Sequence, residues 1–167
     1  WQLHFQAETG RSMTVINSIA DRAPDLRDWR HELHRHPELG YEEVWTSDFI
    51  AGKLESFGIE VHRGMGKTGV VGVLRGTGDS DRAIGLRSDI DALPIHELNE
   101  FDHVSLTPGK MHACGHDGHT TMLLGAAQYL AETRNFDGTV YFIFQPAEEG
   151  GLSLIHISRA HETKANL

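Results

Sequence analysis

Two short segments hold residues that could bind metal ions and activate water. The first reads His-Ala-Cys-Gly-His-Asp-Gly-His and the second Pro-Ala-Glu-Glu-Gly. Cys114 and His116 are two positions apart, so in an extended backbone both side chains point to one side, where a thiolate and an imidazole can bind one metal. Of Glu148 and Glu149, one could hold a metal while the other acts as general base for a water molecule. The two segments predict the chemistry of a metal-dependent hydrolase.

Each of these residues also has an ordinary structural interpretation. A lone cysteine is usually a small buried apolar residue, and two adjacent glutamates usually form a solvated acidic turn. The histidines around Cys114 and the apolar strand before Glu148 and Glu149 favour a metal site instead. His112 and His119 are weaker candidates, because histidine-rich loops also contain orienting and solvent-facing members. We expect neither of them to bind a metal directly.

The elements expected around these segments alternate between helices and strands. Leu26, Trp29 and Leu33 recur at helical spacing, and the helix should end at His36, because a residue before proline disfavours helical geometry. Further helices are predicted over residues 45–57, closed by Gly58, and over 122–131; short buried strands are predicted over 70–74 and 83–86, and a central strand over 139–144. This order indicates an α/β fold with both candidate segments at element ends, where open α/β sheets place their sites.

Composition and charge exclude several classes of protein. The 167 residues are 39% hydrophobic and 23% charged, which allows one domain with a buried core. No apolar run approaches the roughly 20 residues of a membrane-spanning helix, and the N-terminus lacks a secretory pattern. A formal charge of −9 argues against nucleic acid as a partner. One cysteine cannot form an internal disulfide, so we expect a cytoplasmic protein in which a thiolate ligand stays available.

Two weaker motifs are rejected. The segment Gly64–Gly69 fits the dinucleotide pattern G-x-G-x-x-G, but it leads into a valine-rich strand instead of a helix, so we expect a hairpin loop. The segment His-Glu-Leu-His that begins at His31 misses the H-E-x-x-H zinc motif, because Arg35 occupies the position one turn later. Its histidines are expected on a polar helix face.

Four segments together resemble the M20 metallopeptidase family. They are the histidine-rich segment, the Glu-Glu segment, Gly85–Pro94 (Gly-Leu-Arg-Ser-Asp-Ile-Asp-Ala-Leu-Pro) and Trp29–Leu39 (Trp-Arg-His-Glu-Leu-His-Arg-His-Pro-Glu-Leu). They occur in the family's order, and the greatest similarity is to the amidohydrolase branch, which includes hippurate hydrolases and hydrolases of auxin–amino acid conjugates. The resemblance implies a zinc-peptidase-like catalytic domain with a central β-sheet flanked by helices, present here in truncated form.

The resemblance also implies a role for each candidate residue. Cys114 matches the family's metal-bridging ligand. His116 matches a ligand of one metal and Glu149 a ligand of the other, while Glu148 matches the catalytic base. Asp89 matches a position from which a carboxylate could orient a ligand without binding the metal itself. The family uses two further histidines, one shortly after the Glu-Glu pair and one near the C-terminus of a much longer chain, for which we find no credible match.

The two ends of the chain depart from the resemblance. Residues 1–12 lack a family match, and Met13 is the expected start of native sequence. Residues 152–167 are interpreted as non-native read-through sequence, so His156 and His161 are not expected to supply the missing ligands. We therefore expect residues 13–151 to be the N-terminal part of the catalytic domain.

The predicted function is that of a metal-dependent amidohydrolase, which cleaves N-acyl amino acids or small peptide-like amides through water activated by two divalent metals. The family suggests manganese or zinc; thiolate and imidazole favour zinc, whereas carboxylates tolerate manganese. The alternatives are a non-catalytic metal-binding module and an inactive fragment that keeps only the fold. The expected partner is the small-molecule substrate, with no nucleic acid and no membrane, and the full-length protein could form a homo-oligomer. The fragment itself is expected to be inactive.

Overall fold

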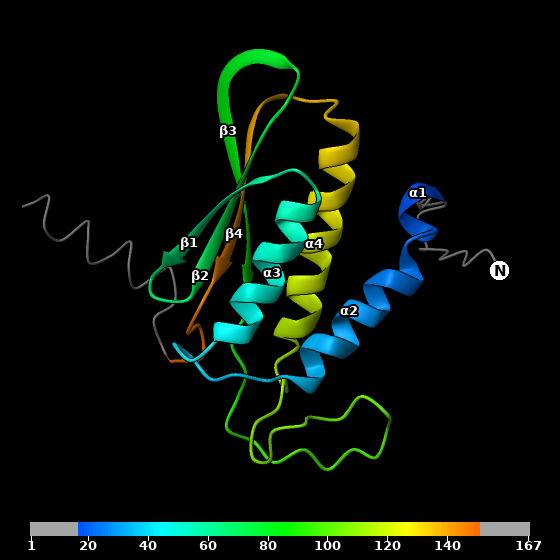
Figure 1. Cartoon of the computed structure of the whole chain (residues 1–167), viewed down its shortest axis with the longest axis vertical. Coiled ribbons are helices and arrows are strands. Elements are labelled where there is room, and N and C mark those ends of the chain that lie inside the picture. Colours follow the sequence, from blue (N-terminus) through cyan, green and yellow to red (C-terminus); the bar gives the residue numbers. More distant parts are fainter. Residues whose placement is uncertain (1–16, 151–167) are drawn as a thin grey trace, which may run out of the picture.

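The computed structural model describes residues 17–150, which form a four-stranded sheet covered by helices (Figure 1). In chain order the elements are α1 (Asn17–Ala20), α2 (Ala23–Arg35), α3 (Val44–Ser56), β1 (Glu60–Met65), β2 (Gly69–Arg75), β3 (Gly78–Asp89), α4 (His116–Thr133) and β4 (Asp137–Gln145). The predicted α/β class is confirmed. The domain boundaries expected near residues 12 and 152 lie outside the described residues, as do His156 and His161.

The strands follow the order β1-β2-β4-β3, so that β4 lies inside the sheet as predicted for residues 139–144. β1 pairs antiparallel with β2, β2 pairs antiparallel with β4, and β4 runs parallel to β3. Alternate residues of β4, Val140, Phe142 and Phe144, are buried in the core, which is the period of two expected for a strand with one covered face. The predicted hairpin loop joins β1 to β2.

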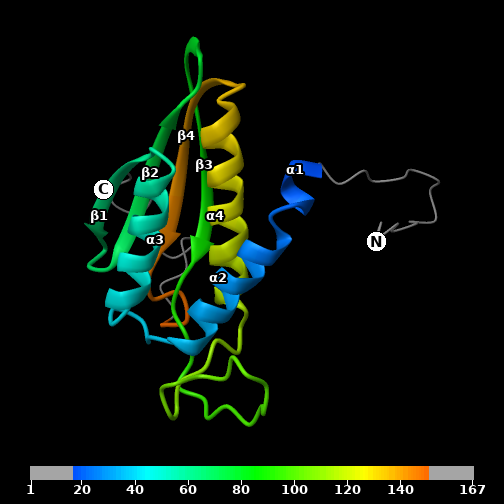
Figure 2. The same ribbon diagram turned by 45° about the vertical axis from the view of Figure 1, so that its right-hand side comes forward.

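Two of the helices pack directly on the sheet, and a third packs on one of those two. Both α3 and α4 pack on the strands, and α2 packs on α4 (Figures 1 and 2). A side chain at Gly125 would bring a Cβ within 2.9 Å of Leu26 on α2, so the absent side chain allows the close approach of the two helices. The predicted end of α2 at His36 and of α3 before Gly58 are both confirmed. Within residues 17–150 no helix combines the length and the apolar character that crossing a bilayer requires.

The strand expected over residues 83–86 is longer and more exposed than predicted. β3 runs from Gly78 to Asp89, and Ile84 within it is 56% exposed. The apolar run correctly marks a strand, but it cannot distinguish an interior strand from one that pairs on one side only. Among the described strands β3 lies at an edge, and its burial is confined to its last two residues, Ser88 and Asp89. β1 was not predicted, because its sequence Glu-Val-His-Arg-Gly-Met is largely exposed and scarcely alternates.

Candidate metal centre

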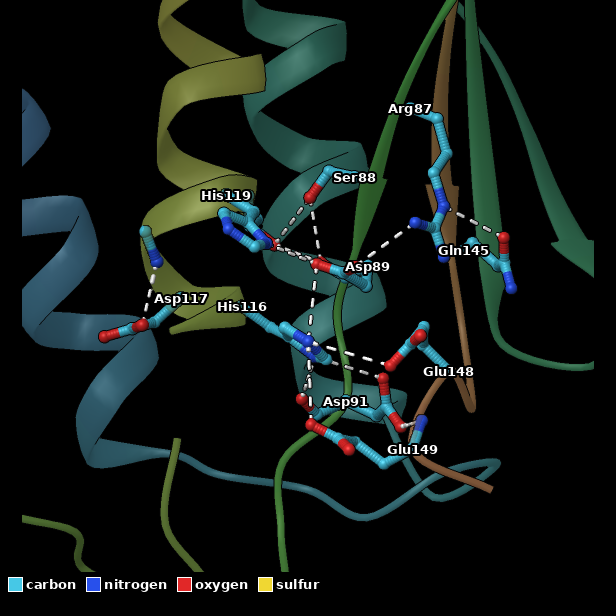
Figure 3. A network of polar contacts seen from close by, with 12 residues as sticks. Arg87, Ser88, Asp89, Asp91, His116, Asp117, His119, Gln145, Glu148 and Glu149 are labelled. Carbon is cyan, nitrogen blue, oxygen red and sulfur yellow. Dashed lines mark hydrogen bonds and ion pairs between the residues drawn. The ribbon is translucent and has the colours of Figure 1, made fainter. Parts of the chain in front are cut away.

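The candidate site lies where two parallel strands end and α4 begins (Figure 3). Asp89 is the last residue of β3 and pairs with Gln145, the last residue of β4. His116 is the first residue of α4. The site therefore lies outside the carboxyl ends of parallel strands, the common location of ligand sites in open α/β sheets.

The three predicted metal-binding residues lie together at this place. The ligand atoms of Cys114, His116 and Glu149 are all within 4.8 Å of one another. The backbone between Cys114 and His116 is not extended as expected, because Gly115 has a φ of 89° and forms the N-cap of α4. Glycine adopts this left-handed conformation without the clash that a Cβ would cause. The turn, and not a strand-like spacing, places the thiol beside the imidazole.

His116 is oriented by a backbone carbonyl. Its Nδ1 lies 2.9 Å from the carbonyl oxygen of Asp91, to which it donates a hydrogen, so Nε2 is left as the ligating atom. Nε2 lies 3.6 Å from Oε1 of Glu149 and 4.0 Å from Oε2 of Glu148. The imidazole is buried, whereas the two glutamates are partly open to solvent. The arrangement presents one fixed nitrogen to both predicted carboxylates.

Asp91 is a site residue for which no role was predicted. Its Oδ2 accepts the backbone N–H of Glu149 at 2.9 Å, and its Oδ1 lies 3.4 Å from Nδ1 of His116. Burial would raise the pKa of Asp91, but hydrogen bonds with His116 and with the backbone N–H groups of Glu149 and Glu148 outweigh it and lower the pKa. Its place two residues after Asp89 was the available signal, since such spacing in an extended segment puts both carboxylates on one side.

The turn that carries the two glutamates is held from α3. Ala147 has a φ of 54°, a left-handed conformation that is unfavourable for a residue with a Cβ. Its N–H donates to Oε1 of Glu43 at 2.9 Å, and the Thr68 hydroxyl donates to Oε2 of the same carboxylate at 2.6 Å. Glu43 is fully buried at the start of α3. Its carboxylate thus fixes the backbone immediately before Glu148 and Glu149.

Asp89, predicted to orient a metal ligand, lies beside His116, but its side chain hydrogen-bonds to another histidine. Oδ1 of Asp89 is 2.7 Å from Nδ1 of His119 and 3.6 Å from Nε2 of His116, while Oδ2 is 3.3 Å from Nη1 of Arg87. Asp89, His116 and His119 form a second group whose ligand atoms lie within 4.8 Å of one another. His119 was expected to be an orienting or solvent-facing histidine. It lies within one of the two possible ligand groups instead.

The centre is rich in negative charge. Four carboxylates, those of Asp89, Asp91, Glu148 and Glu149, lie within 4.0 Å of the imidazole nitrogens of His116. A hydrogen bond to Glu149, burial and the neighbouring carboxylates raise the pKa of the Cys114 thiol to about 11. Burial lowers the pKa of His116, but Asp91 and Asp89 outweigh burial and raise it. Thiol, imidazole and carboxylate donors in an acidic site fit a divalent metal ion.

Other histidines near α4 have different surroundings. His34 is buried, with Nδ1 2.8 Å from Oδ2 of Asp117 and Nε2 3.1 Å from Oε1 of Glu97. The expected polar helix face is thus wrong for His34, because the loop between β3 and α4 folds back over α2. His112 is also buried, and burial lowers its pKa to about 4. Its ring nitrogens have no hydrogen-bond partner among the described residues, and it belongs to neither ligand group.

Comparison with known proteins shows similarity to one peptidase family. The model of peptidase family M20/M25/M40 matches residues 85–165. A hippurate hydrolase from Campylobacter jejuni is 51% identical over 138 residues, which are 83% of this chain and 36% of that protein. An N-acyl-L-amino acid amidohydrolase from Geobacillus stearothermophilus is 47% identical over 127 residues, 75% of this chain and 34% of that protein. The chain is similar to the M20 family over these residues.

A solved M20 structure confirms the predicted fold. The Bacillus subtilis protein described as a dinuclear metal binding peptidase from the M20 family superposes with a TM-score of 0.71 at 42% sequence identity. The match covers 80% of this chain and 36% of that one. The chain thus spans about a third of the length of the relatives that it matches.

Proposed function

We propose that the protein containing this chain is a metal-dependent amidohydrolase that cleaves the amide bond of N-acyl amino acids. The observation that carries the proposal is the ligand group of Cys114, His116 and Glu149, with Glu148 beside it, at the carboxyl ends of β3 and β4. Two relatives support this substrate class by name: one is a hippurate hydrolase and the other an N-acyl-L-amino acid amidohydrolase. Small peptide-like amides belong to the same proposed class.

The proposed cofactor is a pair of divalent metal ions, zinc or manganese. Cys114 would bridge the two metals, His116 would bind one of them and Glu149 the other. The description of the Bacillus subtilis relative as dinuclear supports two metals for the full-length protein. When bound, the metals would polarise the amide carbonyl and lower the pKa of the attacking water.

Glu148 is the proposed general base. Its Oε2 is 4.0 Å from Nε2 of His116, and its side chain is 30% exposed, so solvent water can reach it. It would take a proton from the attacking water and deliver a proton to the leaving amine. The buried carboxylate of Asp91 would keep His116 and the Glu149 backbone in place. Asp89 would hold the neighbouring imidazole of His119.

The non-catalytic module and the inactive fragment remain the alternative functions. The described residues place three ligands in each group, and both groups share His116. A binuclear centre with one thiolate, one imidazole and one carboxylate is incomplete, so we expect the 167-residue chain alone to be inactive. A thiolate ligand is best preserved in a reducing compartment, and we propose the cytoplasm on this ground.

Replacing the proposed base in the full-length protein tests the function. Glu148→Gln should retain the metals and lower the rate of benzoyl-glycine hydrolysis by about two to four orders of magnitude, the usual contribution of a positioned general base. Glu149→Gln and Cys114→Ala should lose metal together with activity, because each removes a ligand. Initial rates measured beside metal content separate these roles.

The exposed Glu55 on α3 offers a matched control, and Glu55→Gln should change neither rate nor metal content. Full activity of Glu148→Gln would contradict its role as base. Loss of metal from Glu148→Gln as readily as from Glu149→Gln would show that the two roles are assigned wrongly.

A further inference from the structure

A stack of aromatic rings ties the long connection between β3 and α4 to helix α2. The connection, residues 90–115, projects past the C-terminal end of α2 and returns to α4 (Figures 1 and 2). The imidazole of His31 on α2 lies parallel to the imidazole of His103 on the connection, with ring centroids 3.7 Å apart and ring planes inclined by 3°. The ring of Phe101 also stacks on His103, at a centroid distance of 3.9 Å. These rings belong to neither of the two ligand groups at the candidate metal centre.

Other contacts between the connection and α2 keep their charge near neutral pH. The Leu106 N–H donates to the carbonyl oxygen of Arg35 at 2.9 Å, and the Arg35 guanidinium donates to the carbonyl oxygen of Asp102 at 3.2 Å. Glu32, on the same helix, lies 3.4 Å from Arg35. Backbone groups and arginine do not titrate near neutral pH, whereas imidazoles do. A change of pH in this range therefore acts on the attachment through its histidines.

His34 places a positive charge beside the stack. The centroid of its ring is 5.8 Å from that of His103. Hydrogen bonding to Asp117 raises the pKa of His34 against the effect of burial, and Glu97 adds to the rise, so His34 is charged below its ordinary pKa of 6.5. Both carboxylates are thereby engaged with His34, and Arg30 also lies 3.4 Å from Asp117. Little negative charge is left to compensate protons on the stack.

A second proton on the stack is disfavoured by its surroundings. Burial lowers the pKa of His103 below its ordinary value of 6.5, and the positive charges of His31, His34 and Arg35 lower it further, while Glu97 opposes them. One imidazolium ring can rest on a neutral aromatic ring through cation–π attraction, but two imidazolium rings face to face repel each other. The stack therefore accommodates one proton and excludes the second.

We propose that His31 and His103 form an acid-sensitive latch, which holds the connection between β3 and α4 against α2 while either imidazole is neutral and releases it when both are protonated. In the released connection both imidazoles titrate near their ordinary pKa of 6.5, so a lower pH favours the released state, which binds the excluded proton. The attachment is thus firm above about pH 6.5 and weakens as the pH falls towards about 5. The latch does not depend on the proposed function, because its rings lie outside the metal centre.

Amide hydrogen exchange of the full chain, followed by NMR in the presence of a chelator, tests the proposal. The Leu106 N–H reports on the attachment, because it donates to Arg35 on α2. Its protection, relative to the exchange rate of an unstructured peptide at the same pH, should fall by about three- to tenfold between about pH 6.5 and about pH 5, the size expected when one proton is excluded from the attached state. The Phe142 N–H, in the buried part of β4, should keep its protection, which separates local release from unfolding.

A double replacement removes the titration and keeps the rings. His31→Phe combined with His103→Phe should change the protection of Leu106 by less than about twofold over the same pH range, because two neutral aromatic rings stay stacked. The exposed imidazole of His62 on β1 supplies the matched control, and His62→Phe should show the same loss of protection as the unaltered chain.

The imidazole resonances give a second measurement. His103 should titrate at a lower pH in the unaltered chain than in His31→Phe, because His31 no longer repels its proton in the variant. An equal loss of Leu106 protection in the double variant and the unaltered chain, or an unchanged titration of His103 in His31→Phe, would overturn the proposal. Loss of protection at Phe142 together with Leu106 would also contradict it, since acid would then unfold the whole domain instead of releasing the connection.

Discussion

The two sides of the first turn of α4 use the same residue types in opposite ways. On the side facing α2, Asp117 meets the imidazole of His34, whose other nitrogen meets Glu97. On the side facing the strands, the imidazole of His116 meets four carboxylates. Figure 3 shows Asp117 turned away from His116, towards α2. Basic and acidic groups are matched on the first side, whereas carboxylates are in excess on the second.

This difference predicts a structural cluster on the α2 side and a binding site on the strand side. A buried carboxylate is costly unless a basic group or hydrogen-bond donors compensate it. His34 and Arg30 compensate Asp117, whereas four carboxylates surround the single imidazole of His116. An uncompensated negative site weakens the fold but attracts a cation, a compromise that functional sites often make. We therefore expect the strand side to bind a cation and the α2 side to stabilise the fold.

The largest expected contrast is in metal affinity. His116→Ala should weaken Zn²⁺ binding by at least about 100-fold, because it removes the imidazole shared by both ligand groups. His34→Ala should change that affinity by less than about threefold, because His34 contacts Asp117 on the opposite side of α4. Calorimetric titration of the two variants and the unaltered chain makes the comparison. Equal losses in the two variants would remove the distinction between the sides.

Without metal, variants on the two sides of α4 should differ by a smaller amount in the free energy of unfolding. Asp117→Asn should lower the unfolding free energy by about 1–3 kcal/mol, because it weakens the buried hydrogen bond with His34. Asp89→Asn should cost less, within about 1 kcal/mol, because it also relieves repulsion among the carboxylates around His116. Urea titrations in the presence of a chelator measure both values. A larger loss for Asp89→Asn than for Asp117→Asn would show that the strand side is not electrostatically stressed.

The sequence predicted best what depends on neighbours along the chain. Helical spacing and Pro37 fixed the extent of α2, and the unbroken apolar run over residues 139–144 identified β4. The proximity of Cys114 and His116 to the Glu-Glu segment was also predicted, because the residue types are chemically distinctive and the two segments lie at element ends. The choice of Glu149 as the ligand came from the resemblance and stays a prediction.

The sequence could not predict contacts that depend on the course of the long connection from β3 to α4. This connection carries Glu97 to His34, and Asp91 to His116, across large separations in the chain. The burial of His34 therefore contradicted its surface-like pattern, and Asp91 was overlooked beside Asp89. Likewise, the apolar residues of β3 gave no sign that the strand pairs on one side only among the described residues.

The smallest expected effect is the pH dependence of the stability that His34 contributes through Asp117 and Glu97. Hydrogen bonding to Asp117 raises the pKa of His34 above its ordinary value of 6.5; burial opposes this, and Glu97 adds to it. A raised pKa in the folded state contributes stability that is fully present below pH 6.5 and is lost as the pH rises through the folded-state pKa. The stability difference between the unaltered chain and His34→Gln should thus be largest near about pH 6 and shrink towards about pH 9. The pKa of Asp117 is lowered, so its contribution persists throughout this range.

Urea titrations at several pH values in the presence of a chelator, with the exposed His62→Gln as control, measure the trend. A difference that grows with pH would mean that His34 is neutral in the fold and that the cluster is held without the charge pair.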